Sequence, residues 1–126
     1  MSTFYGISGS EMEIMQVIWA SNAPVTSTQL LEIFAGKGWK AQTMSTFLSR
    51  LVEKGILQSE KIGRANHYIP AITETEYRRR EARHIMDDYY NGSLSGFLAA
   101  LSGGRGLSKD ELETLRAWFE EVSHGD

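Results

Sequence analysis

Small polar side chains alternate with apolar ones in the segment between Lys40 and Arg50. At the 3.6-residue period of a helix, Met44, Leu48 and Leu51 fall on one face, which predicts that this face packs in a core. The side chains between them are short or rich in donors, so they could reach base edges and phosphates while DNA approaches closely. We therefore predict a DNA-contacting face made of Gln42, Thr43, Ser45, Thr46, Ser49 and Arg50.

The chemistry of the side chains indicates individual roles on and around this face. Gln42 is the candidate to read an adenine, and Arg50 is the candidate to bind a phosphate. An ordinary solvated face is the alternative, but it would normally carry more Glu and Lys. Lys61 and Arg64 in a following hairpin could reach phosphates or a minor groove. Further phosphate contacts are predicted at Lys40, just before the third helix, and at Thr26, Ser27 and Thr28, at the start of the second helix. For these, a solvated turn and simple helix capping are the alternatives.

The charge of the chain is distributed unevenly along the sequence. The formal net charge is −3. From Lys37 to Tyr68, however, six basic and two acidic residues give +4, whereas seven basic and eleven acidic residues from Ala71 onward give −4. The positive charge therefore coincides with the predicted DNA-contacting face, where it could attract phosphates.

Residue types exclude several other kinds of site. The chain has no cysteine, which excludes disulfides, thiolate metal sites and cysteine nucleophiles. His67, His84 and His124 form no i, i+4 pair, and the sequence has no glycine-rich phosphate loop. We expect no enzymatic activity, no metal and no cofactor. No apolar run approaches the roughly 20 residues of a membrane span, and the N-terminus does not resemble a signal peptide, so we expect a cytoplasmic protein.

Local signals predict the elements that would position the DNA-contacting face. Capping boxes that begin at Ser8 and Thr26 predict the first two helices. The segment 41–54 predicts a third helix, which is followed by strands at 56–61 and 66–69. Three helices and then a basic hairpin is the order of a winged helix-turn-helix. We therefore predict a mainly α fold with a small β wing.

The chain after Pro70 changes to amphipathic helices. We predict them at 73–90, ended by Asn91-Gly92, at 93–102, and from a third capping box at Ser108 onward. These helices have too little to bury against one winged domain. We therefore predict that residues 1–71 form a winged-helix domain and residues 72–126 a helical dimerisation domain. The candidate interface residues are Tyr77, Ile85, Tyr89, Leu94, Phe97, Leu98, Leu101, Leu112, Leu115, Trp118, Phe119 and Val122.

The arginine-rich run in the first of these helices has a different explanation from DNA binding. Opposite charges stand four residues apart in three pairs, which are typical of a solvated helix surface. The pairs are Glu74 with Arg78, Glu76 with Arg80, and Arg83 with Asp87. We therefore do not include this run among the predicted DNA contacts.

Four segments together resemble the penicillinase repressor family: "ISGSEMEIMQVIW", "APVTSTQLLEIF", "GWKAQTMSTFLSRLVEKGIL" and "EKIGRANHYIP". The resemblance covers essentially the whole chain. It implies a homodimeric winged-helix repressor that binds a palindromic operator in double-stranded DNA. In such a repressor the third helix lies in the major groove, and the C-terminal helices form the dimer.

The resemblance also implies how repression could end. In the β-lactam branch of the family, a membrane-bound sensor protease starts a signal that ends in cleavage within the dimerisation helices. The matching region here is Leu98, Ala99, Ala100 and Leu101, and it lacks the Asn-Phe pair of the β-lactam repressors. Copper sensing through C-terminal Cys-x-Cys motifs is excluded, because the chain has no cysteine. A signal that disrupts the dimer would release the DNA, since joining two domains raises their joint affinity.

Two rival functions remain open from the sequence. One is a winged-helix regulator that holds a small molecule between the winged domain and the helices, for which Tyr77, Tyr89, Tyr90 and Trp118 are candidates. The other is a winged-helix module that serves protein assembly alone. It predicts no salt-dependent binding to DNA and no selection of a palindrome.

Overall fold

The computed structural model describes residues 6–103 and 106–124. Contacts between residues divide the chain into two compact units, Met1–His84 and Ile85–Asp126. The boundary falls inside a helix and not at residue 71, where the sequence suggested a division. The reason is that the first half of this helix packs on the N-terminal unit through the buried Tyr77.

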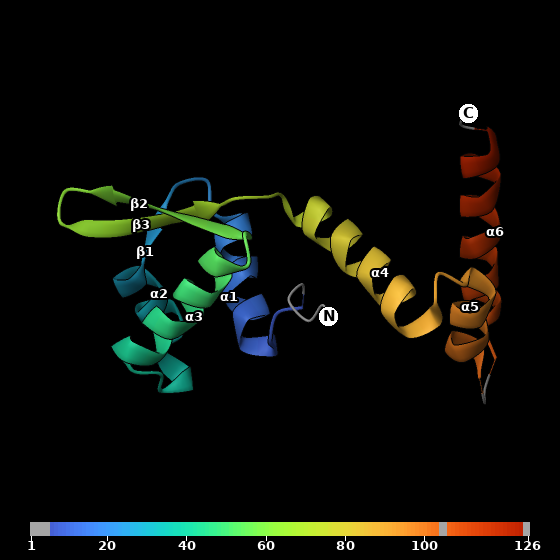
Figure 1. Cartoon of the computed structure of the whole chain (residues 1–126), viewed down its shortest axis with the longest axis horizontal. Helices are drawn as coiled ribbons and strands as arrows, with labels where there is room; N and C mark the ends of the chain where they lie inside the picture. Colours follow the sequence, from blue (N-terminus) through green and yellow to red (C-terminus); the bar gives the residue numbers. More distant parts are fainter. Residues whose placement is uncertain (1–5, 104–105, 125–126) are drawn as a thin grey trace. The chain divides into compact units, whose positions relative to one another are not determined.

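The N-terminal unit combines helices with one small sheet (Figure 1). Its elements are α1 (Gly9–Ala20), β1 (Val25–Thr26), α2 (Ser27–Ile33), the 3₁₀ turn η1 (Ala35–Lys37), α3 (Ala41–Glu53), β2 (Leu57–Ile62), β3 (Ala65–Pro70) and the start of α4 (Glu74–Tyr90). The predicted mainly α fold with a small β wing is thus confirmed.

The sheet is antiparallel, in the order β1-β3-β2. Val25 of β1 lies opposite Tyr68 of β3, and Ile62 of β2 lies opposite Ala65. A tight turn at Gly63 joins β2 to β3, and its φ of 66° is one that glycine adopts without strain. Beyond Leu57 every residue of β2 is exposed, so this hairpin extends as a wing on the side of α1, α2 and α3 (Figure 1).

Capping side chains begin several helices. The predicted boxes are confirmed at Ser8 for α1, at Thr26 for α2 and at Ser108 for the last helix. A further box at α4, in which Thr73 and Glu76 bond each other's backbone N–H at 3.0 and 2.9 Å, was missed in the sequence. Its Thr-Glu-Thr-Glu pattern carried the signal.

The core of the N-terminal unit joins α1, α2, α3, the sheet and α4. Its buried hydrophobic side chains are Ile14, Met15, Ile18, Val25, Leu30, Met44, Leu48, Leu51, Ile56, Leu57 and Tyr77. Two apolar side chains of these helices are exposed: Ile33 of α2 at 56% and Val52 of α3 at 37%. Each lies at the edge of its helix's apolar stripe, where neighbouring elements decide the burial.

The C-terminal unit contains the end of α4, α5 (Leu94–Ser102) and α6 (Lys109–His124). Asn91 and Gly92 end α4 with left-handed backbone angles, as predicted. Tyr90 then packs edge-on against Phe97 of α5, with ring centroids 5.6 Å apart. No described side chain from residue 85 onward is buried. Within the described ranges, no helix has the length and apolar character needed to cross a membrane.

Candidate nucleic-acid interface

Helix α3 presents the polar side chains that were predicted to meet DNA. Gln42, Ser45 and Ser49 are exposed, and their spacing of three and four residues places them on one face. Thr43 and Thr46 are half-buried beside them. The Thr46 hydroxyl donates to the Gln42 carbonyl at 3.0 Å, so its proton is used within the helix. The outer face therefore carries short side chains, which would not hold DNA away from the helix.

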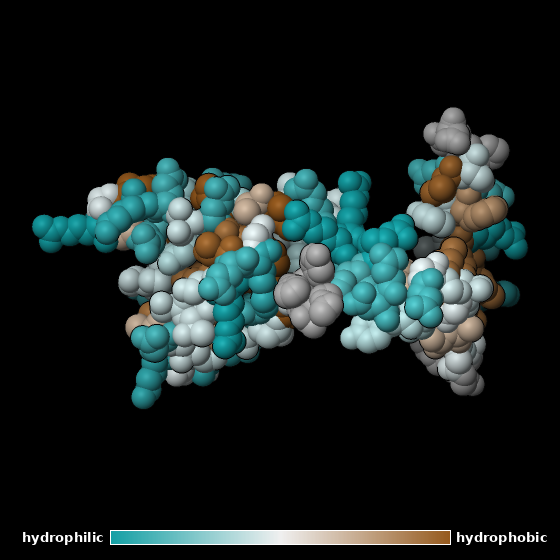
Figure 2. Space-filling view, in the orientation of Figure 1, coloured by the Kyte–Doolittle hydropathy of each residue, from teal (hydrophilic) through white to brown (hydrophobic). Residues whose placement is uncertain are grey.

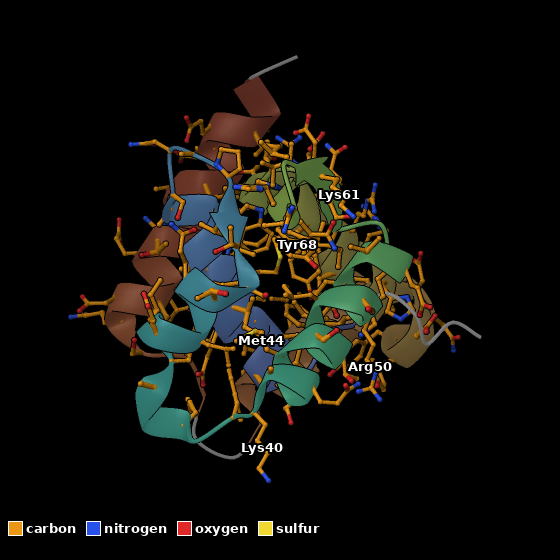
Figure 3. All side chains as sticks on the ribbon, turned by 90° about the vertical axis from the view of Figure 1, so that its left-hand side faces the viewer. Lys40, Met44, Arg50, Lys61 and Tyr68 are labelled. Carbon is orange, nitrogen blue, oxygen red and sulfur yellow. The ribbon has the colours of Figure 1, made fainter. Side chains whose placement is uncertain are left out.

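The other face of α3 packs against the core of the N-terminal unit. Met44, Leu48 and Leu51 are at most 1% exposed, and Figure 3 shows Met44 pointing into the interior while Lys40 projects outward. Near the start of α3, Trp39 packs between two other rings. Its centroid lies 5.3 Å from Phe34 and 5.1 Å from Phe47. Phe47 is thus part of an aromatic cluster at the rim of the core, which supports the N-terminal end of α3.

We call residues 37–68 the basic segment. Its six cations fall into two groups, those with an ion-pair partner and those that are exposed without one among the described residues. Lys37 forms an ion pair with Glu13 at 2.9 Å, and Lys54 forms one with Glu11 at 3.0 Å. The other four, Lys40, Arg50, Lys61 and Arg64, are exposed and form no ion pair within residues 6–103 and 106–124. All four were among the predicted DNA contacts, whereas Lys37 and Lys54 were not, and the structure shows which carboxylates those two lysines meet.

The wing presents Lys61 and Arg64 near its tip. Lys61 lies opposite Asn66 in the hairpin, and Arg64 follows Gly63 in the turn. Between them Ile62 is 48% exposed, an apolar side chain on a solvated tip that was not among the predicted contacts. Its place beside two exposed cations adds it to the candidate surface.

The predicted phosphate site at the start of α2 is only partly open. Thr26 donates its N–H to the Gln29 side chain at 2.8 Å, and the Thr26 hydroxyl accepts from the Gln29 N–H at 3.1 Å. The N–H and the hydroxyl oxygen of Thr26 therefore serve the capping box. Ser27 is half-buried and Thr28 is exposed, and these two residues remain candidates for a phosphate contact.

The C-terminal unit exposes the apolar side chains that were predicted to form a dimer. Figure 2 shows hydrophobic side chains on the surface around α6. The large exposed ones in this unit are Tyr89, Leu94, Leu101, Leu112, Leu115, Trp118, Phe119 and Val122, while Ile85, Phe97 and Leu98 are half-buried. We call this set the apolar surface. Within it an open depression of about 450 Å³ is lined by Leu98, Leu101, Leu107, Leu115 and Trp118, with Asp110, Glu111 and Thr114.

Tyr77 was predicted in the dimer interface and, in the rival function, in a ligand site, but it lies elsewhere. It is 4% exposed in the core of the N-terminal unit, and its ring centroid lies 5.7 Å from that of Trp19. The Trp19 indole N–H also donates to the Ile72 carbonyl at 3.0 Å. Tyr77 therefore fixes the start of α4 and does not contribute to an outer surface.

The remaining predictions for the later helices concern the cleavage region, the ion pairs of α4 and His124. The region 98–101 proposed for cleavage lies within α5. Of the three predicted ion pairs in α4, Arg78 meets Glu74 at 2.7 Å, whereas Glu76 bonds the Thr73 N–H in the capping box. His124 and the last two residues lie beyond the described side chains.

Comparisons with known proteins agree with this arrangement. The Penicillinase repressor family matches residues 7–121. The penicillinase repressor of Bacillus licheniformis is 32% identical over 115 residues, which cover 91% of this chain and 90% of that protein. The methicillin resistance regulatory protein MecI of Staphylococcus aureus (strain N315) is 27% identical over 112 residues, or 89% and 91% of the two chains.

A solved structure matches part of the chain. It is the solution structure of the DNA binding domain of the repressor BlaI, which is 33% identical and superposes with a TM-score of 0.52. The match covers 61% of this chain and 94% of that one. The chain therefore belongs to the penicillinase repressor family of DNA-binding repressors.

Proposed function

We propose that this protein represses transcription as a homodimer that binds a palindromic operator, with α3 in the major groove. The observation that carries the proposal is the outer face of α3, where Gln42, Ser45 and Ser49 are exposed on a helix whose other face is buried. A major groove admits a helix whose outer side chains are short enough to reach base edges. Gln42 is the proposed adenine reader.

Four exposed cations supply the phosphate contacts in this proposal. Lys40 precedes α3, Arg50 lies on its last turns, and Lys61 and Arg64 lie on the wing. Contacts to phosphates fix the orientation of a protein on DNA but carry no sequence information. Ser27 and Thr28 are further candidates for such contacts at the start of α2.

The apolar surface supports dimerisation through the C-terminal unit. Trp118 is 56% exposed and Phe119 is 64% exposed, and this unit has no buried side chain within its described residues. Helices with one apolar face need a partner to cover it. A second copy would cover both surfaces by two-fold symmetry, and the two half-sites would then lie a multiple of about 10 base pairs apart.

The proposed end of repression is a signal that disrupts this dimer. Cleavage in the region 98–101, started by a membrane-bound sensor protease, is the form that the family resemblance suggests. Ala99, Ala100 and Leu101 are exposed on α5. A protease needs an extended substrate, so α5 would have to unwind locally before cleavage.

The proposal is tested by measuring the affinity for DNA that the protein itself selects from a random-sequence pool. Replacing Arg50 by Ala should weaken binding to every sequence and reduce the salt slope by about 1, because one phosphate contact is lost. Arg79→Ala is the matched control, since it removes the same charge from an exposed site on α4. Equal effects of the two replacements would contradict the placement of Arg50. Failure of the wild-type protein to select any sequence would contradict the function.

A further inference from the structure

Lys54 ends the candidate recognition helix with a side chain that turns back into the protein. It is the residue that caps the C-terminus of α3. Its ammonium group lies 3.0 Å from Oε1 of Glu11 and donates to the Gly6 carbonyl at 3.1 Å. These bonds span more than forty residues of sequence, so they tie the end of α3 to Glu11 of α1 and to Gly6 in the segment before α1.

The partner carboxylate is buried. The Glu11 side chain is 2% exposed, while that of Lys54 is 24% exposed. Burial by itself would raise the pKa of Glu11, but hydrogen bonds from Ser8 and Lys54, and the charge of Lys54, outweigh it and lower the pKa. The Ser8 N–H donates to the same Oε1 at 2.8 Å. Glu11 is therefore an ionised group whose bonds have fixed directions.

Helix α4 packs on the same N-terminal segment. A Cβ placed on Gly6 would lie 3.6 Å from Oε2 of Glu81, so the Glu81 carboxylate lies over this glycine. Tyr77, one turn earlier, is buried, and its burial together with the Glu81 charge raises the pKa of Tyr77 to about 12. Residues 6–8 thus form a junction that is contacted from both α3 and α4.

The same unit contains an ion pair with a different environment. Lys37 and Glu13 lie 2.9 Å apart, but their side chains are 44% and 45% exposed. Exposed ion pairs contribute little to the stability of a protein, whereas a buried charge that loses its partner lowers that stability strongly. The Lys37–Glu13 pair therefore offers a matched control for the Lys54–Glu11 pair, with the same charges and another link to α1.

We infer that Lys54 and Glu11 are positioning residues for sequence recognition: they hold the C-terminal end of α3 at the orientation in which its outer face meets base edges. This inference rests on the proposed binding of DNA by α3. It assigns to Lys54, a cation of the basic segment, a role other than contact with phosphate.

The physical reason is the difference between apolar and directional contacts. Met44, Leu48 and Leu51 hold α3 on the core, but apolar packing is not directional and permits small tilts of a helix. The bonds of Lys54 restrict such tilts at one end. Base contacts depend on the orientation of α3, whereas attraction to phosphates depends mainly on charge. Loss of the pair should therefore reduce specific binding more than non-specific binding.

The test compares two buried-site variants, Lys54→Met and Glu11→Gln, with two control variants, Lys37→Met and Glu13→Gln. Each full-length protein is titrated with the duplex that the wild type selects from a random pool, and with a scrambled duplex, over a range of salt concentrations. The active fraction of each preparation is measured by stoichiometric titration. Glu11→Gln keeps the size and an acceptor oxygen, so it remains informative if Lys54→Met does not fold.

In both buried-site variants we expect the ratio of specific to non-specific affinity to fall about tenfold. A loss of this size corresponds to one impaired base contact. Their salt slopes should stay at those of their charge-matched controls, and the controls should keep the wild-type ratio. An unchanged ratio in Glu11→Gln would overturn the inference. So would a salt slope that falls by about 1 in Lys54→Met alone, since Lys54 would then bind phosphate. If the wild type selects no sequence, the proposed function itself fails.

Discussion

The apolar surface of the C-terminal unit leads to a quantitative prediction for Trp118→Ala. Trp118 is 56% exposed in the single chain. A tryptophan can bury up to about 250 Å², so roughly 140 Å² remains to be covered. At about 25 cal/mol per Å², complete burial would stabilise a dimer by roughly 3.5 kcal/mol per protomer.

Association realises only part of this free energy, because ordering the interface opposes it. We take about 2 kcal/mol per protomer, the threshold of a strong interface residue. A two-fold dimer contains the residue twice, so the loss is about 4 kcal/mol. The dissociation constant of the dimer should therefore rise about 1000-fold.

Sedimentation equilibrium of the wild type and of Trp118→Ala, over the same concentration range, measures this change. Glu120→Ala is the control, since Glu120 lies about 200° around α6 from Trp118. The control should stay dimeric. If Trp118→Ala dimerises as tightly as the wild type, the interface does not include this part of α6, and the reasoning from the exposed area is refuted.

Four further predictions concern the N-terminal unit and its binding. A chain that ends at Gly92 should remain folded and become monomeric, as circular dichroism and sedimentation would show, because the buried hydrophobic core lies before that residue. Leu48→Ala should lower the free energy of unfolding in urea by about 2–5 kcal/mol, whereas Ser49→Ala should change it little. Gln42→Ala should relax the preference at one base position by about 1–3 kcal/mol when selection is repeated. Since the pKa of Tyr77 is raised to about 12 in the folded protein, its contribution to stability should be complete below about pH 10 and lost as pH rises towards 12, and Tyr77→Phe should abolish this dependence.

Local signals explain why much of the N-terminal unit could be predicted. A capping box needs only residues three positions apart, so the starts of α1, α2 and α6 were readable at Ser8, Thr26 and Ser108. The two faces of α3 follow from the helical period alone. The turn at Gly63 needs a residue that tolerates positive φ. Each of these features is decided by neighbours in the sequence.

Some features of the candidate site could not be predicted from such local signals. Lys37 and Lys54 have the same formal charge and lie in the same basic segment as Lys40, but each pairs with a carboxylate of α1. Val52 continues the apolar pattern of α3 and is nevertheless 37% exposed. Both facts depend on which element lies beside α3, and helical periodicity does not contain that information.

The sequence by itself determined that this chain forms a winged helix-turn-helix with a polar-faced third helix and later amphipathic helices. These properties follow from residue type and spacing, which set local backbone preferences and apolar periodicity. Only the tertiary structure decided that Tyr77 belongs to the core, and that Lys54 pairs with the buried Glu11 while Lys40 and Arg50 are exposed. Burial and ion pairing are made by residues distant in the sequence, so they are fixed only when the helices pack.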